Sequence, residues 1–347
     1  MDHFLEEILS QPRVLRATLD RYMEDESLLP SVSRATKQRE YPLVLLTGMG
    51  SSYFALYPAC IYLVEHGVSA AMVETSELLH YYGGLISNRV LVVVASQSGE
   101  TVEVKKLLSE FGGRTFIASV TNDAENYLAG NSDLALFLYG GEERAPASKT
   151  HTTTIAVASL LAMSLTSTMS RQKVQGLYEA VQAMGTFLGG WTGRIDGLVD
   201  FLGEVDCLSL LARGPSLASA MAGALILKEA AKMRAEGMSG GQFRHGPLEV
   251  VTPDFTAVVF AMNGRTRDIN LRLAHDIVEF GGKVVLIGND EQLRGKRVFN
   301  LTLPPLDEFC SPMLEIVPIQ LLSWRVAAEK GLQPGKLDKA KKVTLHE

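Results

Sequence analysis

Cysteine and excess positive charge are both scarce in this chain of 347 residues. The three cysteines, Cys60, Cys207 and Cys310, lie far apart. They form no Cys-x-x-Cys pair for a metal and no disulfide framework, which fits a reducing cytoplasm. A net charge of −6 argues against a nucleic-acid partner, because binding to phosphates requires a basic face. We therefore expect a cytoplasmic protein that does not bind nucleic acid.

Membrane-spanning and targeting segments are lacking as well. Residues 152–170 carry no charge, but nine of them are Ser or Thr and few are large and apolar. Such a segment predicts a buried helix in a protein core and not a bilayer span. The acidic residues Asp2, Glu6 and Glu7 argue against a secretory signal peptide. We predict no membrane partner.

Cofactor motifs are a third absence. The sequence has no nucleotide P-loop of the form G-x-x-x-x-G-K-[ST], no dinucleotide fingerprint and no cluster of residues with metal-ligand spacing. We therefore predict a chemistry that uses neither a metal ion nor a redox cofactor.

Apolar strands that alternate with helical segments dominate the first half of the chain. The length predicts about two domains. After an amphipathic helix at 1–23, strands are expected at 43–47, 71–74, 90–95, 115–120 and 134–138, with helices at 53–65, 76–83 and 101–111. This alternation predicts an α/β fold in which helices cover both faces of a parallel sheet, a three-layer αβα arrangement.

Three landmarks of the first half recur in the same order in the second half. Gly50 follows a predicted strand of the first half, and Gly214 follows the corresponding strand of the second half. Residues 94–99 correspond to 259–264, and residues 110–113 correspond to 279–282. The repetition predicts a duplicated domain. We predict an N-terminal helix (1–30), a first domain (31–170), a helical connection (171–200), a second domain (201–330) and a C-terminal tail (331–347).

A run of small hydroxyl residues, Ser96-Gln97-Ser98-Gly99-Glu100-Thr101, directly follows the buried strand. Backbone N–H groups at a helix N-terminus and several hydroxyl donors make a site for a dianion such as a phosphate ester. No lysine is present in the run, which suits a phosphate that is held and not transferred. A simpler interpretation is a hydrophilic turn in which Thr101 caps the helix. The second copy has Ala261-Met262-Asn263-Gly264 instead, so we expect only the first copy to hold the phosphate.

Further motifs carry a family resemblance. They are residues 222–229, 243–248 and 337–344, together with Gly50-Ser51-Ser52 and the run 96–101. As a set they resemble the tandem sugar isomerase (SIS) domain family, which includes the isomerase half of glucosamine-6-phosphate synthase and stand-alone aminosugar-phosphate isomerases and deaminases. The resemblance implies two tandem SIS domains, each a flavodoxin-like parallel sheet flanked by helices.

The resemblance also implies a set of site residues. The sugar phosphate would be surrounded by Gly50, Ser51, Ser52, Ser96, Gln97, Ser98 and Thr101. Glu229 would move a proton between C1 and C2, and His245, reaching in from a neighbouring subunit, would assist ring opening. Lys341, on a tail that closes the active site, would form a Schiff base with a ketose carbonyl.

Each of these three residues has a simpler interpretation. Glu229 is also explained as a solvated helix residue paired with Lys228 or Lys232. His245 precedes Gly-Pro and is also explained as part of a turn. Lys341 belongs to a run of lysines typical of a solvated tail, in which Lys339 and Lys342 compete for its role.

The resemblance implies a phosphosugar isomerase or deaminase that acts on a 6-phosphorylated amino sugar or ketosamine, of the glucosamine-6-phosphate or fructose-6-phosphate type. We expect no glutaminase domain, because no such domain precedes the first copy. The expected assembly is a homodimer with a shared active site and the uncharged helix 152–170 in the interface. The alternative is a non-catalytic phosphosugar sensor, because SIS domains serve both purposes.

Overall fold

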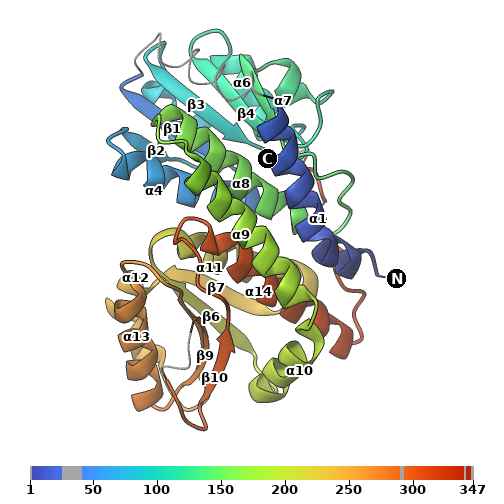
Figure 1. The fold of residues 1–347 in the computed structure, drawn as a ribbon, viewed down its shortest axis with the longest axis vertical. Coiled ribbons are helices and arrows are strands. Elements are labelled where there is room, and N and C mark those ends of the chain that lie inside the picture. The colour runs from blue at the N-terminus through green and yellow to red at the C-terminus, as the bar shows by residue number, and fades with distance from the viewer. Residues whose placement is uncertain (1, 26–40, 290–292, 340, 345–347) are drawn as a thin grey trace. The chain divides into compact units, whose positions relative to one another are not determined.

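A computed structural model describes residues 2–25, 41–289, 293–339 and 341–344 (Figure 1). The chain forms two compact units. Unit 1 contains residues 1–12, 144–146 and 179–337, and unit 2 contains residues 13–143, 147–178 and 338–347. The parts of the predicted N-terminal segment and tail at 26–30, 340 and 345–347 lie outside the described residues.

Unit 2 is built on a five-stranded parallel sheet. Its strands are β1 (Leu43–Gly48), β2 (Ala70–Met72), β3 (Val90–Ala95), β4 (Phe116–Thr121) and β5 (Leu134–Phe137), in the order β2-β1-β3-β4-β5. All six residues of β3 are buried, which is why this strand reads as a continuous apolar run. The predicted parallel sheet is confirmed.

The helices of unit 2 follow the predicted segments with two differences. They are α3 (Gly50–Ala55), α4 (Tyr57–Glu65), α5 (Thr75–Glu77), the π-helical turn η1 (Leu78–Tyr82), the 3-10 turn η2 (Gly83–Leu85), α6 (Val102–Phe111), α7 (Tyr127–Gly130) and α8 (Lys149–Leu165). The helix expected at 53–65 is interrupted at Leu56, where α4 begins with a proline in its first turn. The helix expected at 76–83 is mostly a π-helical turn.

Helix α8 contains most of the uncharged segment predicted as a buried helix at 152–170, but it begins at Lys149 and ends at Leu165, so residues 166–170 lie outside it. Residues 149–164 are all buried within the single chain. Its hydroxyl groups are satisfied by carbonyls of the same helix: Thr153 Oγ1 donates to Lys149 O (2.9 Å) and Thr154 Oγ1 to Thr150 O (2.7 Å). Because these side chains are already covered, the prediction that this helix lines a dimer interface is not supported. None of the helices in the described part of the chain has the length and apolar character that a membrane span requires.

Unit 1 repeats the same architecture. Its parallel strands are β6 (Cys207–Ala212), β7 (Arg234–Ser239), β8 (Thr256–Ala261), β9 (Lys283–Gly288) and β10 (Val298–Thr302), in the order β10-β9-β8-β6-β7. The order is that of unit 2 with β6 in the place of β1. Gly50 and Gly214, after these two strands, have the same left-handed backbone (φ 50° and 59°), which supports the duplication.

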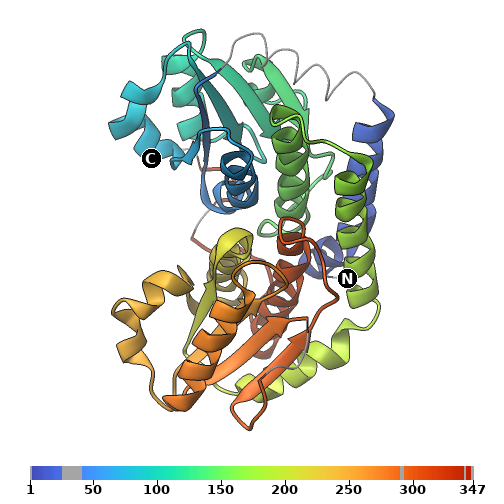
Figure 2. The ribbon, with the colours of Figure 1, turned by 60° about the vertical axis from the view of Figure 1, so that its left-hand side comes forward.

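Helices cover both faces of each sheet (Figure 2). In unit 1 they are the 3-10 turn η3 (Gly214–Ser216), α11 (Leu217–Ala231), α12 (Gly240–Arg244), the 3-10 turn η4 (Pro247–Val250), α13 (Arg267–Glu279) and α14 (Ser311–Glu329). The remaining helices are α1 (His3–Glu24), α9 (Arg171–Leu188) and α10 (Trp191–Leu202). The boundary between the compact units falls inside α1 and inside α9.

Candidate active site

The loop 96–101 connects β3 to α6 and has one well-defined shape. Gly99 adopts φ 65°, and a Cβ at this position would overlap the Asn126 amide, so only glycine fits. The ends of the loop are tied to neighbouring segments, because Ser96 N donates to Val120 O (3.1 Å) and Leu128 N donates to Gly99 O (3.1 Å). The loop is therefore preorganised at the carboxyl edge of the sheet.

The serine hydroxyl groups of this loop accept hydrogen bonds from its own backbone. Ser96 Oγ accepts from Gly99 N and Ser98 Oγ accepts from Glu100 N, both at 3.2 Å. A hydroxyl that accepts a hydrogen bond still has its own O–H to donate. Thr101 is the N-cap of α6, yet its Oγ1 is buried without a hydrogen bond in the described part of the chain. The side chain of Thr101 thus does not cap the helix, contrary to the simpler interpretation of the loop.

The one acidic side chain of the loop is neutralised locally. The Glu100 carboxylate lies 2.7 Å from Lys105 Nζ and accepts from Tyr127 N (2.6 Å). The hydrogen bond from Lys105, more than that from Tyr127, lowers the pKa of Glu100. This pairing weakens the repulsion that Glu100 would exert on an anion in the loop.

A second polar segment lies beside the first loop. Gly50, Ser51 and Ser52 are the first three residues of α3, which follows β1 with Met49 as its N-cap. β1 pairs with β3 so that Gly48 stands next to Ala95. The strand order reverses between β1 and β3, which is where ligands bind in open α/β sheets. Ser51 Oγ lies 2.9 Å from His151 Nδ1. The side chains of Ser52 and Gln97 are half-buried and make no hydrogen bond within the described residues.

The C-terminal tail reaches the same loop within unit 2. Thr344 O accepts from Val102 N (3.1 Å), at the first residue of α6. Lys342 Nζ lies 3.1 Å from Glu143 Oε2, and the Glu143 side chain is 0% exposed. The tail is therefore attached at two points, of which the one at Val102 directly adjoins Thr101.

Glu143 is held by α8 as well as by the tail. Its carboxylate accepts from Ser148 N (3.0 Å) and Thr150 N (3.1 Å), and thus satisfies N–H groups at the start of α8. Burial acts to raise the pKa of Glu143, but Lys342 and the hydrogen bonds from Thr150 and Ser148 outweigh it and hold the pKa below its usual value. The ion pair with Lys342 is therefore charged at neutral pH.

The structure sets Lys342 apart from the other two lysines that the sequence leaves in competition. Lys342 is engaged by Glu143, whereas Lys341 and Lys339 are both exposed. Lys341 is the one of these two that directly adjoins the anchored residue.

Glu229 and His245 belong to unit 1. Glu229 is half-buried in the last turn of α11, where Lys232 Nζ donates to the carbonyl oxygens of Glu229 (2.7 Å) and Lys336 (2.6 Å). His245 is exposed directly after α12, and the ion pair of Arg244 with Asp276 (2.5 Å) holds that short helix on α13. The structure brings the loop 96–101, the first turn of α3 and the tail together in unit 2 and places these two residues in unit 1.

Sequence reasoning missed two residues of this region, Glu143 and His151. Both lie outside the charge-free segment 152–170 that drew attention to the helix. A glutamate shortly before Ser148, which starts the helix, is a signal for a capping carboxylate, and it could have identified Glu143. Nothing local marks the pairing of His151 with Ser51, which are 100 residues apart in the chain.

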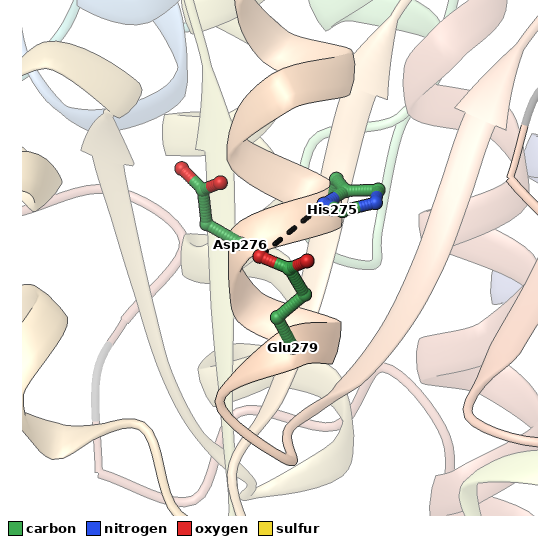
Figure 3. Close-up of side chains that lie close together, drawn as sticks. All are labelled: His275, Asp276 and Glu279. Atoms are coloured by element: carbon green, nitrogen blue, oxygen red, sulfur yellow. Dashed lines mark ion pairs between the residues drawn. The ribbon is translucent and has the colours of Figure 1, made fainter.

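One group of possible metal ligands occurs among the described residues: His275, Asp276 and Glu279 on α13 (Figure 3). His275 and Glu279 are exposed and form an i,i+4 ion pair at 3.6 Å. Asp276 is paired with Arg244. We interpret the group as ion pairs on a helix surface.

Comparisons with known proteins agree with this geometry. The SIS domain profile matches residues 42–164 and 204–330, which include both sheets. The chain belongs to the SIS domain family. Its two copies are tandem SIS domains in an α/β fold.

Among SIS relatives, the glutamine–fructose-6-phosphate aminotransferase [isomerizing] of Pyrococcus horikoshii is 29% identical over 99% of this chain. The chain spans 58% of that relative's length. The C-terminal domain of glucosamine-fructose-6-phosphate aminotransferase from Francisella tularensis has a TM-score of 0.86 at 23% identity, covering 98% of both chains. Glucosamine-6-phosphate deaminase from Thermotoga maritima has a TM-score of 0.78 at 20% identity, covering 99% of this chain and 100% of that one. These two likenesses establish the fold.

Proposed function

We propose that this SIS chain is an enzyme that isomerises or deaminates a 6-phosphorylated amino sugar or ketosamine. The observation that carries the proposal is the set of unused hydroxyl donors of Ser96, Ser98 and Thr101 in a preorganised loop at the strand-order reversal. Hydroxyls and helix N–H groups bind a phosphate without reacting with it. Two similar proteins, the isomerizing aminotransferase and glucosamine-6-phosphate deaminase, support the same substrate class.

In the proposed mechanism, His245 acts in ring opening and Glu229 acts in proton transfer. The phosphate is anchored by the loop 96–101 and the first turn of α3. His245 donates a proton to the ring oxygen as the anomeric hydroxyl releases its proton to water, so the bond between the anomeric carbon and the ring oxygen breaks and the open-chain carbonyl forms. The Glu229 carboxylate then takes the proton from one of C1 and C2 and returns it to the other, which interconverts aldose and ketose. In the deaminase variant the amine leaves as ammonia after isomerisation, and water supplies the oxygen.

The anchored tail supports Lys341 as the residue that meets the carbonyl. Lys342 would have to leave a buried carboxylate in order to react, whereas Lys341 is exposed. A free amine adds to a carbonyl and loses water to form a Schiff base. Borohydride reduction in the presence of fructose 6-phosphate should therefore attach the sugar to Lys341.

The phosphate assignment is tested first with Ser98→Ala. A hydrogen bond to a charged group contributes about 1.5–3 kcal/mol, so the variant should bind sugar phosphates at least about tenfold more weakly. Calorimetric titration with fructose 6-phosphate and with inorganic phosphate measures this loss. Ser109→Ala, an exposed serine at the far end of α6, is the control and should bind like wild type. Equal affinity of Ser98→Ala and wild type would remove the assignment.

The reaction is tested with a panel of phosphorylated amino sugars and ketosamines. Isomerisation incorporates solvent deuterium at C1 or C2, and deamination releases ammonia, so NMR and an ammonia assay separate the two. If several sugar phosphates bind and none exchanges a proton or loses ammonia, the protein is a phosphosugar sensor and not an enzyme.

A further inference from the structure

His151 is a buried histidine in the first turn of α8, and its ring contacts the first turn of α3. Its side chain is 2% exposed. Nδ1 lies 2.9 Å from Ser51 Oγ and 3.2 Å from Ser51 O. Both contacts are within unit 2, and they join the ring to Ser51, a residue of the proposed phosphate site.

The two contacts decide which ring nitrogen carries the hydrogen. A backbone carbonyl only accepts hydrogen bonds, so the approach of Nδ1 to Ser51 O requires an N–H at Nδ1. The imidazole is neutral at pH 7, because burial lowers the pKa of His151 to about 4. Nε2 then has a lone pair only, and it is buried without a hydrogen bond in the described part of the chain. An unpaired acceptor is tolerated more readily than an unpaired buried N–H.

This tautomer has a consequence for Ser51. Its Oγ accepts from Nδ1–H, and its own O–H remains free to donate elsewhere. With the hydrogen on Nε2, Ser51 would donate its proton to the ring and could offer a phosphate only a lone pair. The direction of one hydrogen bond thus determines whether Ser51 attracts or repels an anion.

We propose that His151 is a positioning residue for the phosphate site, which holds the Ser51 hydroxyl as a hydrogen-bond donor toward the substrate phosphate. The proposal rests on the proposed function, since it assigns a role only if Ser51 meets a phosphate. His151 acts through Ser51 and does not touch the substrate.

Two substitutions of similar polarity separate this role from simple packing. The side-chain N–H₂ of His151→Asn lies where Nδ1 lies and can still donate to Ser51. The amide of His151→Gln reaches the position of Nε2 and cannot. We expect inorganic phosphate and fructose 6-phosphate to bind to His151→Asn within about threefold of wild type, and to His151→Gln at least about tenfold more weakly. For a substrate that turns over, KM should follow this loss while kcat changes by less than about twofold.

A double-mutant cycle makes the test specific for Ser51. Once Ser51→Ala has removed the hydroxyl, His151→Gln should cause no further loss of phosphate affinity. Additive losses, or equal losses in His151→Asn and His151→Gln, would overturn the proposal. The same titrations of Ser98→Ala distinguish a failure of the phosphate site from a failure of the role of His151. If Ser98→Ala binds normally, the phosphate site itself is wrong; if it binds weakly and His151→Gln binds normally, only the role of His151 fails.

Discussion

Glu229 lies in the last turn of α11, and the proposed role of its carboxylate is to transfer a carbon-bound proton of the substrate. Glu229→Gln keeps the size of the side chain and removes the base. Turnover should fall by roughly 10²–10⁴-fold while KM changes little, because the phosphate contacts remain. Steady-state kinetics on the substrate found in the panel measure both quantities. Lys228→Gln, at the exposed neighbouring position, should behave like wild type; full activity of Glu229→Gln would contradict the mechanism.

Glu315 is a second residue whose protonation has a measurable effect. It is fully buried on α14, where Ser216 Oγ donates to it (2.8 Å), and burial raises its pKa from 4.5 to about 7. Between pH 4.5 and 7 the folded state holds a proton that the unfolded state has lost. Glu315 therefore adds stability at low pH, and this stability is lost as the pH rises through 7.

Glu315→Gln keeps the neutral form at every pH. Its free energy of unfolding relative to wild type should rise by about 1–3 kcal/mol between pH 5 and pH 8. Urea unfolding at both pH values measures this difference. For the exposed Glu110→Gln the difference from wild type should not change with pH. A pH-independent difference for Glu315→Gln would show that the carboxyl is ionised in the fold.

At the scale of elements, the tail and α8 are coupled through the ion pair of Lys342 with Glu143. Lys342→Met keeps the length of the side chain and leaves the buried carboxylate unpaired, which should cost about 1–3 kcal/mol of stability. The released tail should be cut faster by trypsin, and turnover should fall at least about tenfold because Lys341 loses its placement.

Two further variants identify the cause of this loss. Lys339→Met, at an exposed position of the same tail, should leave the stability and the turnover unchanged. Glu143→Gln combined with Lys342→Met removes both charges and should recover part of the stability without restoring turnover. Normal turnover in Lys342→Met with a trypsin-sensitive tail would show that the ordered tail is not needed.

At the scale of the whole molecule, we propose a homodimer in which His245 contributes to the active site of the partner subunit. The domain boundaries that the sequence predicts also stay a proposal. Mixing the inactive variants Glu229→Gln and His245→Ala would then create heterodimers with one intact site of two. With random subunit exchange about a quarter of wild-type activity should return. Native mass spectrometry shows whether the subunits exchange. A mixture that contains heterodimers and stays inactive would contradict a shared site.

The sequence determined by itself the features that depend on neighbouring residues. Apolar runs such as Val90–Ala95 predict buried parallel strands, and the run 96–101 predicts the turn that follows β3, in which Gly99 has a left-handed backbone. The recurrence of Gly50 as Gly214 predicts the duplication, because the same left-handed turn needs the same residue. These signals are local, since they arise from periodicity, turn chemistry and backbone sterics.

Tertiary structure alone decided the contacts between distant parts of the chain. Lys342 and Glu143 are 199 residues apart, and Ser51 and His151 are 100 residues apart, so no local pattern links them. The engagement of Lys342, and the hydrogen-bond partner that selects the proposed tautomer of His151, both depend on groups that only the fold brings close.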